Sequence, residues 1–159
     1  MSCQPHSCAG CSGSCCAGCT RKTPLILRKA EAAFLLRFSE LPFLPVVRFT
    51  LSRPGLPAQP GDSLAPVFLQ SAADSLETVR CTARILQRLE QLRLISIDYA
   101  EPLIHFNYTE YVNSGAFTEF SSAANGFSIP KIEYGSMALL AYGQETIDDL
   151  ELTVLPSGF

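Results

Sequence analysis

The sequence lacks the features that mark membrane and secreted proteins. No apolar run approaches the roughly 20 residues that a membrane-spanning helix needs. The first residues, MSCQPHSCAGC, contain neither the basic nor the apolar region of a secretory signal. We therefore expect a cytoplasmic protein that has no membrane partner and whose thiols stay reduced.

Motifs for catalysis are also missing. The chain contains no G-x-S-x-G, no phosphate-binding loop and no H-E-x-x-H, and its only histidines are His6 and His105. The acidic cluster Asp148, Asp149 and Glu151 is best explained as solvated surface charge. We expect that the protein is not an enzyme.

Positive charge is scarce for a protein of 159 residues, whose net charge is −3 and whose pI is near 5.3. This balance excludes a protein that coats nucleic acid by charge alone, although a site-specific binder can gather its basic residues on one face. A hydrophobic content of 47% supplies enough material for one folded domain.

Cysteine is abundant only at the start of the chain, where six of the seven cysteines lie within the first nineteen residues. Two C-x-x-C pairs stand close together, Cys8 with Cys11 and Cys16 with Cys19. Four such thiolates are suited to zinc or to an iron–sulfur cluster. Three further residues are spare candidate ligands: Cys3, Cys15 and His6. The alternative is a thiol-rich tail, residues 1–22, that binds no specific metal.

The folded domain, residues 23–159, is organised around the stretch from Asp74 to Tyr99. Apolar residues recur there every three or four positions, which predicts one buried face of a long helix: Leu76, Val79, Ala83, Ile85, Leu86, Leu89 and Leu92. Asp74 or Ser75 offers a cap for its first turn. After Leu94 the β-branched and aromatic residues predict a short strand that follows the helix directly.

Other segments have the pattern of a single element or loop. Before the long helix we expect a helix over Leu25–Leu41 opened by Thr23 and Pro24, a strand over Val46–Leu51, a mobile loop over Ser52–Pro66, and a short strand or helical turn over Ala65–Ala73. After it we expect a second strand over Leu103–Tyr108, antiparallel to the strand that follows the long helix, and an insertion over residues 108–130 with a short helix near Tyr111–Ser121. A third strand over Ile132–Leu140 and a closing helix over Gly143–Leu152 complete the domain.

Basic residues recur on the exposed side of the long helix, where Arg80, Arg84 and Arg88 are four positions apart. Three polar residues lie near this row: Thr78, Gln87 and Gln91. Arginine and glutamine on a helix can contact base edges or phosphates of DNA. The alternative is a solvated face on which these arginines pair with Glu77 and Glu90. The neighbouring Cys81 is predicted to be a small buried hydrophobe.

Two pieces of the chain resemble a known family. The segment from Glu77 to Ile95 resembles the recognition helix and first wing strand of winged-helix regulators such as the MarR and PadR groups. The piece from Ala138 to Gln144 is similar to their return strand and the helix start that follows. The resemblance implies an α+β winged helix-turn-helix with an insertion in its wing. The cysteine-rich tail belongs to neither group, although the layout is similar to bacterial proteins that pair such a tail with a winged-helix-like domain.

These observations favour a metal- or redox-responsive transcriptional regulator that binds double-stranded DNA. An alternative is an adaptor for protein interaction or for metal or cluster delivery, whose winged helix binds a protein. The acidic pI and the bulky insertion favour this alternative, because both hinder close approach to a duplex. A third hypothesis is a small electron-transfer protein with a cluster in the tail. For each hypothesis, the protein could act as a homodimer.

Metal binding by the tail is directly testable. Protein purified without oxygen is expected to contain zinc, or to show the visible absorption of an iron–sulfur cluster, because its paired thiolates are suited to either. Metal analysis and a visible spectrum of the same sample distinguish the two. Colourless, metal-free protein would contradict both the sensor and the electron-transfer hypotheses.

Overall fold

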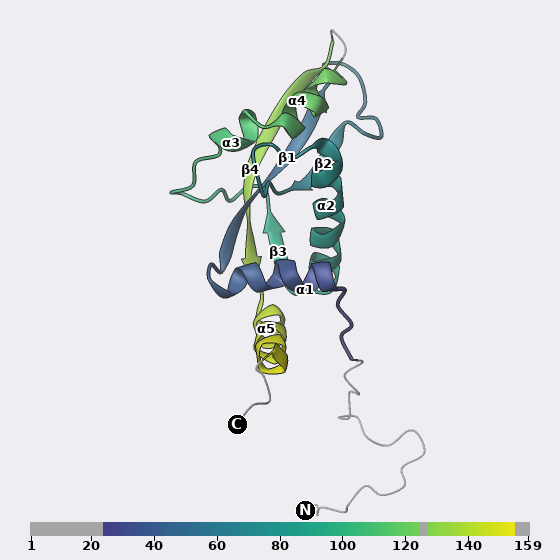
Figure 1. Cartoon of the computed structure of the whole chain (residues 1–159). Coiled ribbons are helices and arrows are strands. Elements are labelled where there is room, and N and C mark those ends of the chain that lie inside the picture. Colours follow the sequence, from purple (N-terminus) through teal and green to yellow (C-terminus); the bar gives the residue numbers. More distant parts are fainter. Residues whose placement is uncertain (1–23, 125–126, 155–159) are drawn as a thin grey trace, which may run out of the picture.

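Two long strands form the centre of the structure, a computed structural model that describes residues 24–124 and 127–154. Strand β1 (Phe43–Ser52) pairs antiparallel with β4 (Ile129–Leu139), from Phe43 opposite Ala138 to Ser52 opposite Ile129. Strand β2 (Ser63–Val67) lies outside β1, and β3 (Ile95–Asp98) lies outside β4. The four-stranded antiparallel sheet and its helices confirm the predicted α+β class (Figure 1).

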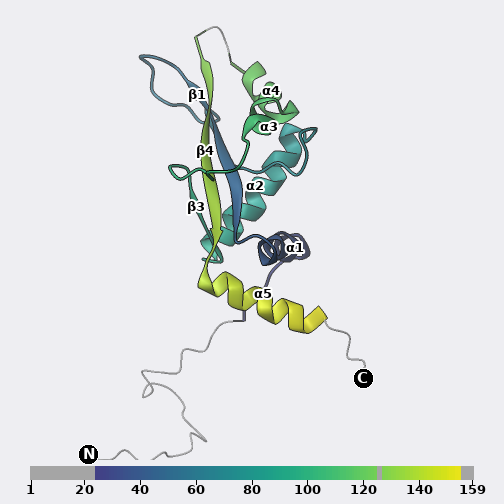
Figure 2. The ribbon, with the colours of Figure 1, turned by 90° about the vertical axis from the view of Figure 1, so that its left-hand side faces the viewer.

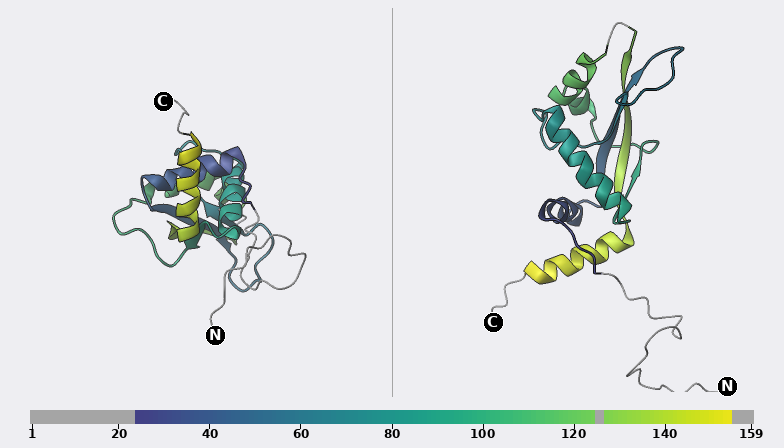
Figure 3. Two further views of the ribbon diagram at one scale, coloured as in Figure 1. Left: turned by 90° about the horizontal axis from the view of Figure 1, so that it is seen from below. Right: turned by 90° about the vertical axis from the view of Figure 1, so that its right-hand side faces the viewer.

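The helices cover one face of this sheet. Helix α1 (Lys29–Leu35) continues into the 3₁₀ turn η1 (Leu36–Ser39), and the long α2 (Leu76–Gln91) runs along the sheet. The short helices α3 (Thr109–Val112) and α4 (Gly115–Ser122) lie on the same side (Figure 2). Helix α5 (Ala141–Val154) crosses α1 at the end of the sheet (Figure 3). None of the helices in the described ranges is long and apolar enough to cross a membrane.

A charged and aromatic contact lies beside the core near the middle of β1. Val47 and Phe49 are fully buried in the core, whereas Arg48 between them is only half-buried. The Arg48 guanidinium is 3.0 Å from the Glu133 carboxylate and lies 4.1 Å from the centre of the Tyr99 ring. Arg48 therefore joins β1, β4 and the end of β3 at a partly exposed position.

The long helix predicted at the centre of the chain is confirmed. Its N-cap is Ser75, whose side chain accepts a hydrogen bond from the Thr78 N–H at 3.2 Å. Of the seven apolar residues predicted for its inner face, four are buried and three are half-buried: Val79, Ala83, Leu86 and Leu89, then Leu76, Ile85 and Leu92. The predicted strand follows it as β3.

The connection between α2 and β3 is a tight C-terminal cap. The Leu94 N–H donates to the Leu89 carbonyl at 3.0 Å, and the Arg93 N–H donates to the Glu90 carbonyl at 2.9 Å. Arg93 has a φ of +59°, a left-handed conformation that helix caps usually reserve for glycine. The chain therefore turns from helix to strand with almost no intervening loop.

Two hydrophobic clusters form the core. One lies between α1, α2, α5 and the end of the sheet and contains Phe38, Leu86 and Leu89. The other lies under α3 and α4 and contains Phe49, Val79, Tyr111 and Phe120. Helix α2 contributes to both clusters and joins them.

The strand predicted over Leu103–Tyr108 is wrong, because this segment is a loop. The Leu103 N–H donates to the Tyr108 hydroxyl at 2.9 Å, so a side chain takes the place of a neighbouring strand. Ile104 is 91% exposed, which is incompatible with a strand packed in the sheet. The strand beside β3 is instead β4, whose prediction over Ile132–Leu140 is confirmed.

Other boundaries also differ from the prediction. The first helix begins at Lys29 and not near Pro24, because the Glu31 carboxylate accepts the Arg28 N–H at 2.9 Å and caps the helix there. The predicted loop over Ser52–Pro66 ends earlier, since β2 begins at Ser63. The predicted insertion contains the helices α3 and α4 and ends where β4 begins, and the predicted closing helix is α5.

Close packing between α5 and the end of α2 predicts the effect of a small substitution. A Cβ at Gly143 would overlap the Leu94 carbonyl, whereas a Cβ at Gly115 would lie 3.6 Å from the nearest atom, the Asp74 carbonyl oxygen. We expect Gly143→Ala to lower the free energy of unfolding by about 1–3 kcal/mol. Gly115→Ala should change it by less than about 0.5 kcal/mol. Equal stability of the two variants in chemical denaturation would contradict the packing described.

Candidate nucleic-acid interface

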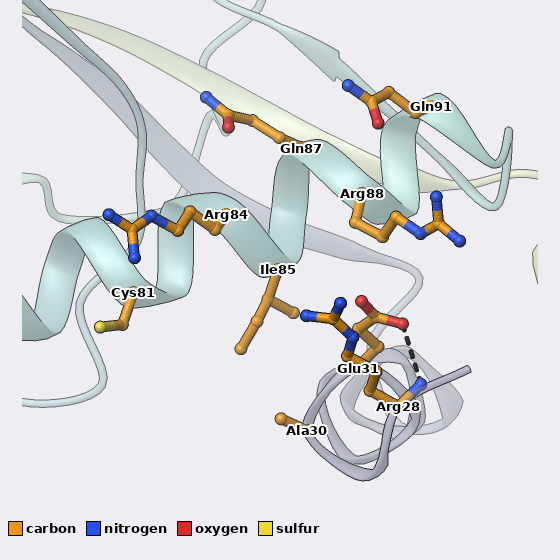
Figure 4. Close-up of a pocket in the computed structure, with 9 residues that line it drawn as sticks. All are labelled: Arg28, Ala30, Glu31, Cys81, Arg84, Ile85, Gln87, Arg88 and Gln91. Atoms are coloured by element: carbon orange, nitrogen blue, oxygen red, sulfur yellow. Dashed lines mark hydrogen bonds between the residues drawn. The ribbon is translucent and has the colours of Figure 1, made fainter.

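An open groove runs between α1 and the exposed side of α2. It has a volume of about 540 Å³ and combines residues of both helices, which are Arg28, Ala30, Glu31, Cys81, Arg84, Ile85, Gln87, Arg88 and Gln91 (Figure 4). Four of the six residues predicted to contact DNA are therefore at one place: Arg84, Gln87, Arg88 and Gln91. Thr78 and Arg80 lie closer to the start of α2, outside the groove lining.

The arginines of α2 have no acidic partner among the described residues. Arg80, Arg84 and Arg88 are exposed, and their guanidinium groups form no ion pair or hydrogen bond with any part of the chain that the structure describes. Glu77 and Glu90 lie on the same helix but do not pair with them. The structure therefore contradicts the alternative in which these arginines pair with Glu77 and Glu90.

Arg28 belongs to the groove although the sequence pattern did not single it out. It is the N-cap residue of α1, and its side chain extends toward α2 between the positions of Arg84 and Arg88 (Figure 4). Glu31 is 5% exposed, and its carboxylate binds the Arg28 backbone N–H. The Glu31 carboxylate thus caps the start of α1. The guanidinium groups of Arg28, Arg84 and Arg88 face solvent.

Two of the predicted contact residues have structural roles. The Gln87 Nε2 donates to the Ala65 carbonyl at 3.1 Å and ties α2 to β2. The Thr78 hydroxyl lies 3.0 Å from the Ser75 hydroxyl at the helix cap. Gln91 has no such bond within the described segments, so its amide remains available to a ligand.

The prediction that Cys81 is buried is wrong. Its thiol is exposed and lines the groove beside Arg84. The reason is its place on α2: Val79, Thr82 and Ala83 point into the core, whereas Cys81 lies on the outer side of the helix, one turn before the half-buried Ile85.

A second groove is apolar and lies at the start of β1, between this strand and the loop around Ile104. Its volume is about 560 Å³, and its lining includes Leu41, Phe43, Ile104, Phe106 and Tyr111. Burial raises the pKa of the Tyr111 hydroxyl far above its ordinary value, so that this group stays protonated at all physiological pH values. Leu41, Phe43 and Ile104 are largely exposed, which leaves an apolar surface open to solvent.

The predicted metal ligands Cys8, Cys11, Cys16 and Cys19, with the spare candidates Cys3, Cys15 and His6, lie outside the described residues. Among the described residues, no three His, Cys, Asp or Glu side chains are grouped so that they could hold a metal ion.

The two glutamines of the groove allow a matched test of structural against ligand-binding roles. Gln87→Ala removes the bond between α2 and β2 and is expected to lower the free energy of unfolding by about 1 kcal/mol. Gln91→Ala removes no bond within the described chain and should change stability by less than about 0.5 kcal/mol. Thermal or chemical unfolding measures both, and a larger loss for Gln91→Ala would contradict the assignment.

Comparison of the chain with protein-family models, with curated proteins and with solved structures finds no match.

Proposed function

We propose that the protein is a metal- or redox-responsive transcriptional regulator that binds double-stranded DNA through α2. The observation that carries this proposal is the row of exposed guanidinium groups on α2 that no described carboxylate neutralises. Exposed arginines at helical spacing form charge-assisted, often bidentate bonds to phosphates and to guanine edges. The net negative charge of the chain is compatible with this role because three arginines line one groove: Arg28, Arg84 and Arg88.

The arrangement of elements supports a winged-helix reading of the site. In that reading α2 is the recognition helix, and β3 with β4 forms the wing that follows it. Residues 99–128, which include α3 and α4, are then the insertion within the wing. The row Arg80, Arg84 and Arg88 would face the duplex, with Gln91 beside it.

The sensing function is assigned to the N-terminal cysteines. Zinc or an iron–sulfur cluster held by Cys8, Cys11, Cys16 and Cys19 would order a segment that precedes α1. The described chain starts at Pro24, four residues before Arg28 of the groove. A tail that changes its order near this end of α1 would change access to the groove, and any such coupling needs a different interaction of the tail in the two states.

The alternative function is a protein-interaction or metal-delivery adaptor, and the apolar groove favours it. Phe43 is 56% exposed and Ile104 is 91% exposed, so this surface exposes large apolar side chains to water. Contiguous apolar surface of this kind is common where proteins bind one another. An adaptor would use this groove and not the arginine row.

A binding assay at low salt separates the two functions. Wild-type protein is expected to bind duplex DNA, with an affinity that falls as salt rises, because each phosphate contact releases counterions. Arg84→Ala/Arg88→Ala should weaken binding at least tenfold, since each charge-assisted bond contributes about 1.5–3 kcal/mol. Fluorescence anisotropy with labelled duplex measures the affinity.

The control is Lys29→Ala/Lys131→Ala, which removes two positive charges at exposed positions that do not line the groove. Its affinity should stay close to that of the wild type. If the wild type binds no duplex at low salt, whether specific or nonspecific, the regulator proposal is wrong and the adaptor is favoured.

A further inference from the structure

We infer that Arg28 is a ligand of a DNA phosphate and that the groove between α1 and α2 holds the backbone of one DNA strand at the rim of the major groove. This inference rests on the proposed function and specifies how the same site would bind its partner. It assigns a role to a residue far from α2 in the sequence, and it makes part of the interface independent of base sequence.

The three guanidinium groups are arranged as a track and not as a single pocket. In Figure 4 the groups of Arg84 and Arg88 point away from each other along α2, the group of Arg28 lies between them on the α1 side, and the three do not converge on one point. Arg84 and Arg88 are four residues apart, which is about 6 Å along a helix axis. Successive phosphates of one strand rise about 3.4 Å along the duplex axis and are displaced around it as well, so the distance between neighbouring phosphates is comparable to the spacing of the two arginines. A row of this kind is suited to a chain of phosphates.

The width of the DNA major groove prevents α1 from contacting base edges. The major groove of DNA is about 12 Å wide and admits one helix, whose diameter with side chains is about 10–12 Å. Here α1 packs directly against α2, so the pair is too wide for both helices to enter together. If α2 enters the major groove, α1 has to remain at its rim, where the backbone phosphates are the accessible acceptors.

The cap of α1 holds the backbone of Arg28 in place. Its backbone N–H binds the buried Glu31 carboxylate, and this bond does not involve the guanidinium group. The side chain has no ion pair with any described residue and is exposed. Arg28→Ala therefore leaves the helix cap in place and removes only the proposed phosphate contact.

The salt dependence of DNA binding tests the inference. Removal of one phosphate contact lowers the magnitude of the slope of log K against log salt by about 0.9. The loss of affinity in Arg28→Ala should therefore be about 3.5-fold larger at 50 mM than at 200 mM salt. The loss should be the same on duplexes of unrelated sequence. Arg28→Lys keeps a positive charge and should retain most of the slope, and thermal unfolding of each variant verifies that the fold is intact.

Lys29→Ala is the matched control, because Lys29 is the next residue on α1, is exposed and does not line the groove. Its slope should equal that of the wild type. If Arg28→Ala behaves like Lys29→Ala while Arg84→Ala/Arg88→Ala loses affinity, the role of Arg28 is wrong and the DNA-binding proposal stands. An effect of Arg28→Ala that is confined to one base sequence would also overturn the inference. If the wild type binds no duplex, the role of Arg28 and the DNA-binding proposal are both wrong.

Discussion

Burial of one face of α2 is the interaction on which the rest of the structure depends. The helix supplies Leu86 and Leu89 to one hydrophobic cluster and Val79 to the other, and all three are fully buried. Burial of each such side chain contributes about 1.5–3 kcal/mol, so together they match much of the net stability of an ordinary domain. Without α2 the two clusters would have no common element, and the sheet would lose most of its cover.

The same helical period that buries these residues places the arginines on the other side. Like charges one turn apart on a helix repel each other, at a cost of about 0.2–0.5 kcal/mol per pair. No carboxylate in the described segments forms an ion pair with these arginines. An anion bound along the row would relieve this repulsion.

Local patterns in the sequence predict the helices and strands that depend on neighbouring residues. They do not predict which elements pair or pack when these are distant in the sequence. The period of α2, its cap at Ser75 and the strand after it depend on neighbouring residues, and the structure confirms them. The strand paired with β3 lies more than 30 residues further along, and no local signal distinguishes it from the loop at Leu103. Arg28 joins the candidate site, and Cys81 is exposed, because of how α1 packs on α2.

The cap at Arg93 has a mechanical consequence. Because α2 passes into β3 without a flexible linker, and β3 is hydrogen-bonded to the long β4, the helix cannot tilt or slide without distorting the sheet. A hinge that swings α2 between two orientations is therefore incompatible with this fold. The spacing of the arginines along α2 is therefore set by the sheet as well as by the helix itself.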